Sequence, residues 1–153
     1  MSQHNVTIEW RRRAAGFAYA TYDRGHVLRF GEGVELPARA APENIPPTAP
    51  RAPGADPEQT FVAAIASCHM LWFLHFACDG KLVVDSYRDD AVGVLEKDRD
   101  GRMAVTRVTL RPKVAFGGGT SPTPEQLRAL HDRAHAHCFI ASSVKSEVTV
   151  EIR

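Results

Sequence analysis

Three cysteines and seven histidines are the side chains of this 153-residue sequence that suit redox or metal chemistry. Cys68 and Cys78 lie in the apolar segment ASCHMLWFLHFACDG at 66–80, and Cys138 lies in HDRAHAHCFIASS at 131–143. Thiols and imidazoles inside an apolar segment fit three kinds of structure: a membrane span, a metal site or a buried reactive thiol.

The membrane alternative rests on the segment 60–78, which has no charged residue and is long enough to span a bilayer. Its flanks have no basic bias, no other segment resembles a span, and its interior contains Ser67, Cys68, His69 and His75. We therefore interpret it as a buried helix and expect no membrane partner. A chain of this length rarely encloses a helix on all sides, so this interpretation predicts a homodimer.

The metal alternative rests on His131 and His135, which have the four-residue spacing of zinc ligands on a helix, with Cys138 within about 60° of the same face. However, Asp132 stands where the zinc-protease motif requires glutamate, and the sequence has no Cys-x-x-Cys pair. The sequence therefore favours a protein without a metal or other cofactor. We expect His131, His135 and His137 to lie on a polar helix face.

Charge and cysteine content limit the classes of partner and compartment. Lysine and arginine number 19 against 18 acidic residues, so the net charge of +1 gives no reason to expect nucleic acid as a partner. The cysteine count is odd, and the N-terminal residues lack an apolar signal segment. These features predict free thiols in a reducing compartment, the cytoplasm.

The order of the expected elements predicts one domain over 1–153. Residues 1–36 read as a meander of strands at 5–10, 16–22 and 26–30, and residues 37–56 form a proline-rich loop. Residues 57–153 follow the order helix, strand, strand, helix, strand. This segregated order is typical of the α+β class, with antiparallel sheets wrapped around a long central helix.

Two helices begin with nearly the same residues, DPEQ at 56–59 and TPEQ at 123–126. Each places a capping oxygen, then proline, glutamate and glutamine, which predicts capping boxes and helices at 57–78 and 124–139. The strands are expected at 82–96 and 103–116, joined by a turn at Asp100 and Gly101, and at 144–152.

Helical geometry separates the two cysteines of the first helix. Cys68 and His75 lie within about 20° of one another, whereas Cys78 is turned by about 80° from Cys68 and lies about 15 Å along the axis. Cys68 and Cys78 therefore cannot meet, and we expect Cys78 to be a packing residue. A buried thiol such as Cys68 is inert unless a cation or a hydrogen-bond donor stabilises its thiolate.

The segments DPEQTFVAAIASCHMLWFLHFA, VTRVTLRPKVAF and AHAHCFIASSVKSEVTVEI, together with YDRGHVLRF, resemble the OsmC/Ohr family, which comprises osmotically inducible protein C and organic hydroperoxide resistance proteins. HMLWFLHF and the proline-rich loop indicate a divergent branch. The resemblance implies the OsmC-like fold, an intertwined homodimer with active sites at its interface, and a thiol-dependent peroxidase.

The resemblance also implies roles for individual residues. Cys68 matches the peroxidatic cysteine and Cys138 the resolving cysteine. Arg24 matches the arginine that stabilises the thiolate, with Arg29 as the alternative, and Glu58 matches the glutamate that orients the arginine. Apolar side chains suited to organic peroxides would come from Leu71, Trp72 and Phe139.

The chemistry implied is reduction of an organic hydroperoxide through a sulfenic acid on Cys68, a disulfide with Cys138, and reset by an external dithiol, which in the family can be of the lipoyl type. Structural roles are expected for His26, His69 and His75. Because His75 shares a helix face with Cys68, it is the exception we would test first. The alternative function is a non-enzymatic protein of the same fold that senses oxidants or binds a small apolar ligand.

Overall fold

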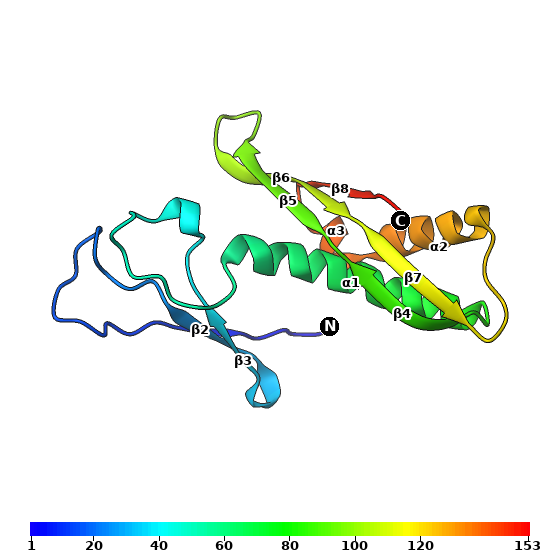
Figure 1. Ribbon diagram of the computed structural model, residues 1–153, viewed down its shortest axis with the longest axis horizontal. Helices are drawn as coiled ribbons and strands as arrows, with labels where there is room; N and C mark the ends of the chain where they lie inside the picture. Colours follow the sequence, from blue (N-terminus) through cyan, green and yellow to red (C-terminus); the bar gives the residue numbers. More distant parts are fainter. The chain divides into compact units, whose positions relative to one another are not determined.

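The computed structural model describes residues 1–153 and divides into two compact units, Met1–Thr60 and Phe61–Arg153 (Figure 1). Each unit is described by itself.

The first unit contains a three-stranded antiparallel meander in the order β1 (Thr7–Glu9), β2 (His26–Arg29) and β3 (Glu35–Ala38). Two short 3-10 helices, η1 (Gly31–Gly33) and η2 (Pro42–Asn44), flank β3. The meander was predicted, but the strand predicted at 16–22 is wrong. There the backbone turns, because the N–H groups of Thr21 and Tyr22 both donate to the carbonyl of Ala18. The third strand is β3 instead, at the start of the predicted loop.

The last residues of the proline-rich segment lie beside the end of β3. Ala55 forms an isolated parallel bridge with Ala38. Gly54 has a φ of +140°, and a Cβ at this position would lie 2.5 Å from the carbonyl oxygen of Pro37, so only glycine permits this approach. Asp56 then starts α1 (Pro57–Asp79) with the predicted capping box, in which the Gln59 N–H donates to Asp56 Oδ1 at 2.8 Å.

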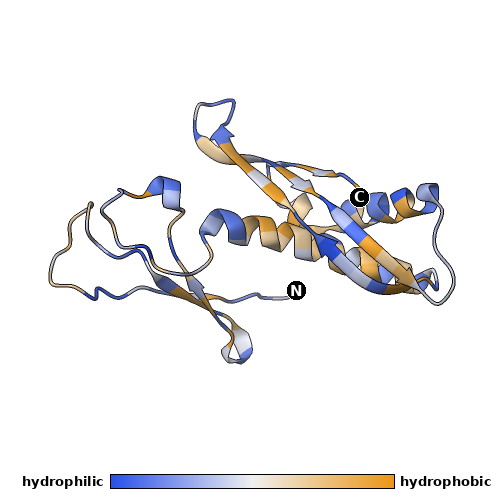
Figure 2. Ribbon diagram, viewed as in Figure 1, coloured by the Kyte–Doolittle hydropathy of each residue, from blue (hydrophilic) through white to orange (hydrophobic).

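The second unit is built along α1, whose buried residues recur every three or four positions: Ile65, His69, Phe73, Phe76 and Ala77. Apolar residues fill the middle turns of this helix, and polar residues occupy its first turn (Figure 2). By length and composition alone α1 could cross a membrane, and 28% of its most apolar 18 residues are buried within the chain. A single chain therefore covers one stripe of α1 and leaves the rest of its apolar surface open.

Both long strands predicted after α1 divide in two. The first becomes β4 (Val83–Asp89) and β5 (Val92–Lys97), and the second becomes β6 (Met103–Leu110) and β7 (Pro112–Gly117). β4 pairs with β7 in one sheet, while β5 pairs with β6 in another. The predicted turn is present, since Gly101 has a φ of +77° between β5 and β6. β8 (Glu147–Val150) joins β6 in parallel, which departs from the predicted antiparallel pairing.

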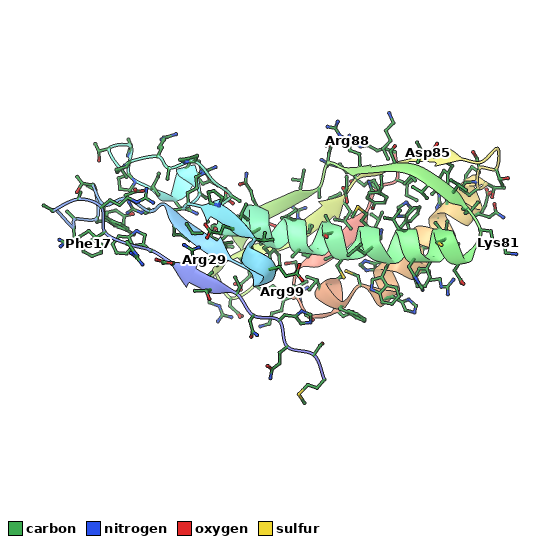
Figure 3. The ribbon with its side chains drawn as sticks, turned by 90° about the horizontal axis from the view of Figure 1, so that it is seen from below. Phe17, Arg29, Lys81, Asp85, Arg88 and Arg99 are labelled. Carbon is green, nitrogen blue, oxygen red and sulfur yellow. The ribbon has the colours of Figure 1, made fainter.

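Two apolar clusters hold these sheets and helices together. Phe73, Phe76 and Ala77 pack with Ala134 of α2 (Pro124–His137), and Ile65 packs with Val108 and Leu110 of β6. Asp85 and Arg88, labelled in Figure 3, are exposed on β4. The predicted capping box of α2 is present, with Thr123 and Gln126 as its two members. The predicted second helix, however, is interrupted at Cys138 and resumes as α3 (Phe139–Ser142).

Gly93 determines how closely β5 approaches α1. A Cβ at Gly93 would lie 2.5 Å from Cγ2 of Val62 and 3.3 Å from Cγ1 of Val105. Valine is stiff at χ1 in a helix, so Val62 has little freedom to move aside. We expect Gly93→Ala to lower the free energy of unfolding by about 1–3 kcal/mol, measured by urea denaturation. Gly16→Ala is the control because its added Cβ meets no atom within 4 Å, and equal stabilities of the two variants would contradict this packing.

Candidate thiol site

Cys138 lies at the break between two helices. It is the C-cap of α2 and the N-cap of α3, where its sulfur accepts a hydrogen bond from the Ala141 N–H at 3.4 Å. The thiol is fully buried and its S–H points to the carbonyl oxygen of Ile65 in α1, 3.9 Å away. The break in the helix therefore turns this sulfur toward the first helix.

Cys68 lies one turn beyond Ile65 on α1 and is half-buried. It is near enough to Cys138 for the two thiols to interact. All three cysteines are free thiols, and Cys78 is exposed near the end of α1. The structure thus brings Cys68 and Cys138 together across two helices, as the predicted pairing requires. Cys78 lies outside the pair, as helical geometry predicts, but at the surface and not in the core.

Burial raises the pKa of the Cys138 thiol to about 11. The Ala141 N–H opposes this shift and Cys68 adds to it. Cys138 is therefore protonated at neutral pH, which makes it a poor nucleophile until another group accepts its proton. This state does not suit a thiol that must react first as a nucleophile.

An aromatic cluster flanks the two thiols. Trp72, one turn after Cys68, has its ring centroid 5.4 Å from that of Phe139, which follows Cys138 directly. His137 and His75 also pack against Trp72, at 5.3 and 5.6 Å. Trp72 and Phe139 therefore contact each other, and Leu71 is 61% exposed beside Trp72 on α1.

The histidines of α2 do not all lie on a polar face, and that expectation is wrong for His131. His131 is 1% exposed, and its Nδ1 lies 3.0 Å from Nε2 of His69, which is also 1% exposed. His135 is half-buried, and His137 is exposed with Nδ1 bonded to the carbonyl of Arg133. No group of three histidine, cysteine or acidic side chains is placed to hold a metal ion. His131 turns to His69, whereas Cys138 turns to Ile65 and Cys68.

Burial lowers the pKa of both His69 and His131 to about 4. Proximity to His131 and His135 lowers the pKa of His69 further, and Asp132 partly offsets the shift of His131. Both imidazoles are therefore neutral at pH 7, and one donates its N–H to the other. His69 Nδ1 and His131 Nε2 have no partner, nor does the buried hydroxyl of Tyr87.

The histidine pair predicts loss of stability in acid. The unfolded chain takes up protons near pH 6.5, whereas the folded chain does so near pH 4, so the stabilisation is complete above pH 6.5 and is lost as the pH falls toward 4. We expect the free energy of unfolding to fall over this window by up to about 1.4 kcal/mol per pH unit for each imidazole. Urea denaturation at several pH values measures it.

The control for this prediction replaces the pair by neutral amides, His69→Gln with His131→Asn. We expect the double variant to show a shallower pH dependence than the parent. Equal slopes in the two proteins between pH 6.5 and 4 would contradict the assignment of this pH dependence to the pair.

Arg24 and Glu58 belong to the first unit and do not form an ion pair with each other there. Arg24 donates to the carbonyls of Tyr19 and Tyr22 at 2.8 and 3.1 Å, and its guanidinium lies 3.8 Å from the centroid of the Tyr22 ring. Oε2 of Glu58 is buried without a hydrogen-bond partner. Each of these two charged groups therefore lacks an oppositely charged partner.

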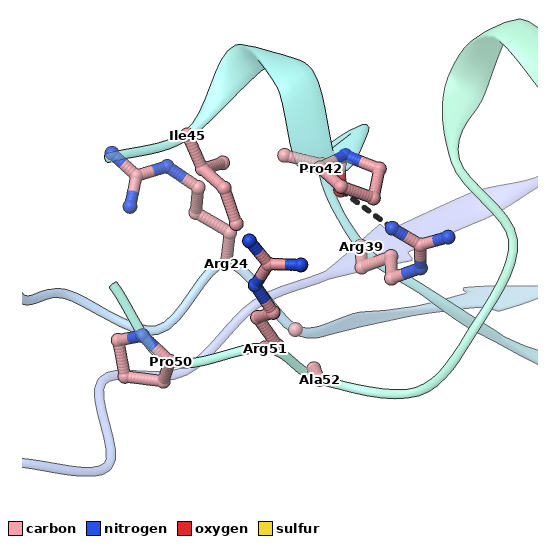
Figure 4. A pocket seen from close by; sticks show the side chains of 9 residues that line it. Arg24, Arg39, Pro42, Ile45, Pro50, Arg51 and Ala52 are labelled. Atoms are coloured by element: carbon pink, nitrogen blue, oxygen red, sulfur yellow. Dashed lines mark hydrogen bonds between the residues drawn. The ribbon is translucent and has the colours of Figure 1, made fainter. Parts of the chain in front are cut away.

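Two other arginines of the first unit already have carboxylate partners. Arg29, the alternative assignment, pairs with Glu9 and Glu35. Arg39, which the sequence did not single out, lies 3.8 Å from Asp56 and donates to the carbonyl of Gly54. Arg24, Arg39 and Arg51 line one small pocket together (Figure 4). Of the two arginines assigned from the sequence, Arg24 and Arg29, only Arg24 has no carboxylate partner.

A larger groove of about 500 Å³ in the first unit was not predicted. Trp10, Phe17 and Tyr22 line it, and their ring centroids lie 5.1 to 6.3 Å apart. His26 and Arg24 also line it. The alternation of aromatic residues at 16–22 was the available signal, but it was interpreted as a strand.

The central helix α1 is covered by sheets, and its Cys68 lies near Cys138 at the break after α2. These features define an α+β protein with a thiol pair. Residues 50–153 match the family described as OsmC-like protein, and the chain belongs to this family. No protein with a curated description matches the sequence.

Solved structures agree with this family. An OsmC-like protein of unknown function from Vibrio cholerae is 44% identical, with a TM-score of 0.94 over 100% of both chains. The organic hydroperoxide resistance protein OhrB of Bacillus subtilis is 21% identical, with a TM-score of 0.70 over 99% of this chain and 98% of its own. An organic hydroperoxide resistance protein from Elizabethkingia anophelis is 15% identical, with a TM-score of 0.70 over 99% and 94%. The predicted OsmC-like α+β fold is confirmed, and the last two likenesses concern the fold alone.

Proposed function

We propose that this chain is a thiol-dependent peroxidase that reduces organic hydroperoxides. The observation that carries the proposal is the meeting of Cys68 on α1 with the buried thiol of Cys138 at the end of α2. Proteins named for organic hydroperoxide resistance share the fold, which supports the same chemistry. Free thiols require a reducing environment, so we place the protein in the cytoplasm.

The reaction begins at Cys68. Its thiolate attacks one peroxide oxygen, the O–O bond breaks, and the alkoxide takes up a proton and leaves as the alcohol. Cys68 is oxidised to a sulfenic acid. The Cys138 sulfur then attacks the Cys68 sulfur as its proton passes to the departing hydroxide, which leaves as water. An external dithiol, for which the lipoyl type is our candidate, reduces the disulfide by exchange.

Arg24 is our candidate for stabilising the Cys68 thiolate, and Glu58 for orienting the guanidinium through a bidentate pair. Two observations support this assignment: Glu58 Oε2 is buried without a partner, and Arg24 has no carboxylate partner. Leu71, Trp72 and Phe139 are the proposed substrate contacts, because they present apolar surface beside the two thiols.

A homodimer is part of the proposal because one chain leaves much of α1 uncovered. Leu71, Phe139 and Ile140 are exposed apolar side chains on or near this helix. A second copy of the chain would remove such a surface from water, which favours association.

Peroxide consumption tests the proposed function. We expect the protein to consume cumene hydroperoxide with dihydrolipoamide as reductant, followed by stopped-flow spectroscopy. Cys68→Ser should abolish turnover, because the variant lacks the thiol that attacks the peroxide. Cys138→Ser should complete one turnover and stop, leaving a sulfenic acid on Cys68 that dimedone labels in a mass spectrum.

Cys78→Ser is the matched control, because Cys78 lies on the same helix but outside the thiol pair. Turnover that persists in Cys68→Ser would overturn the proposal, and so would the absence of turnover in both the parent and the Cys78→Ser protein.

Substitution of the arginine tests its assignment. Arg24→Lys keeps the charge but loses the bidentate geometry, so we expect peroxide reduction to slow by about 10–100-fold, as for loss of one charge-assisted contact. Arg29→Lys is the control, since Arg29 is already paired with Glu9 and Glu35. A larger loss in Arg29→Lys than in Arg24→Lys would reverse the assignment.

The second candidate function is binding of a small apolar ligand without turnover. The groove lined by Trp10, Phe17 and Tyr22 favours it, because aromatic side chains around a volume of about 500 Å³ suit such a ligand. A protein that oxidises once but turns over with no dithiol, and that quenches its tryptophan fluorescence on binding an aromatic ligand, would support this candidate.

A further inference from the structure

His69 of α1 and His131 of α2 form a buried hydrogen bond between the two helices. The Nε2···Nδ1 distance is 3.0 Å, and the two rings are parallel to within 4°. The His131 ring also stacks on Phe73 at 4.4 Å. Both imidazoles are buried, so water cannot replace this bond when it breaks.

The two histidines lie on the same two helices as the two thiols. His69 follows Cys68 directly on α1, and His131 precedes Cys138 by two turns on α2. The second link between these helices in this region is the weak contact from the Cys138 thiol to the Ile65 carbonyl. The histidine pair is therefore the stronger directional contact that relates the two thiol-bearing helices.

A directional bond fixes helix register in a way that apolar packing does not. Apolar side chains tolerate a small slide of one helix on another, whereas a buried hydrogen bond at 3.0 Å is lost when its atoms move apart. Disulfide formation makes the same geometric demand, because two sulfurs must approach to about 2.05 Å with a narrow range of dihedral angles.

Burial keeps the pair neutral, and among the groups around it Asp132 opposes this effect only in part. Phe73 covers it from α1, Tyr87 approaches His131 from β4 with Asp89 acting on Tyr87, and Asp132 and His135 flank it on α2. Asp89 Oδ1 is occupied by the Arg111 N–H at 2.6 Å, and no carboxylate accepts from either imidazole. The two histidines therefore depend on each other for their hydrogen bond.

We propose that His69 and His131 are positioning residues, whose hydrogen bond holds Cys138 in the register needed to form a disulfide with Cys68. This inference rests on the proposed pairing of the two thiols. It concerns only the closure of the disulfide, in which two thiols lose two protons and two electrons to an added disulfide reagent, and that reagent becomes a dithiol.

The amides of asparagine and glutamine test the proposal, because the one extra methylene of glutamine places the same polar group at a different position. Asparagine places its amide where histidine has Nδ1, and glutamine places it where histidine has Nε2. The bond uses Nδ1 of His131 and Nε2 of His69. His131→Asn and His69→Gln can therefore retain it, whereas His131→Gln and His69→Asn cannot.

The measurement is the equilibrium constant for disulfide formation between Cys68 and Cys138 against oxidised and reduced dithiothreitol, at pH 7 and without oxygen. All variants carry Cys78→Ser, so that only two thiols remain. We expect His131→Asn and His69→Gln to lie within about threefold of the parent, and the two other variants to form the disulfide about tenfold less favourably. Circular dichroism verifies the fold of each variant.

We expect asparagine to be the better replacement at position 131 and glutamine at position 69. This opposite preference separates a positioning role from a role in filling space. If volume alone mattered, glutamine would be the better replacement for histidine at both positions. Glutamine better at both positions, equal constants for all four variants, or failure of His131→Asn or His69→Gln to fold would overturn the proposal. The experiment uses no peroxide, so a failure to reduce peroxides would leave its result unchanged.

Discussion

The packing of α2 against α1 is the contact on which the thiol site depends. Cys68 lies on α1 and Cys138 caps the end of α2, and Cys78, the other cysteine of α1, lies outside the pair. Phe73, Phe76 and Ala134 supply the apolar part of this contact, and the buried histidine pair supplies a directional part. The sheets hold α1 from its other covered side, where Gly93 permits close approach to Val62. Displacement of one helix along the other would separate the two sulfurs.

Local chemistry made the helices predictable, and long-range pairing made the strands less so. Capping boxes at Asp56 and Thr123 located the starts of α1 and α2 correctly, because the capping residues lie within one turn. The breaks that divide the strands near Asp90 and Arg111 depend on which sheet each half joins, and alternation does not report that. At 16–22 aromatic residues favour a strand, but no neighbouring strand pairs with them and the chain turns at Ala18 instead.

Only those residues of the candidate site that belong to a recognisable motif could be predicted from the sequence. Cys68 and Cys138 were identified by resemblance, since spacing alone cannot bring two distant segments together. The break at Cys138 was missed because helix-forming residues continue on both sides of it, and the sulfur caps the second piece. The histidine pair was missed for a related reason. His131 has charged neighbours in the sequence, and its burial is decided by Phe73 and His69 on another helix.

One sulfur atom has two structural roles in this chain. The Cys138 sulfur receives the Ala141 N–H and so caps α3, a helix of four residues with little stability of its own. In the proposed reaction that sulfur would be bonded to Cys68 and would no longer be free to point toward the Ala141 N–H. The cap of residues 139–142 would then differ between the reduced and the oxidised chain, and so would the exposed surface at Phe139.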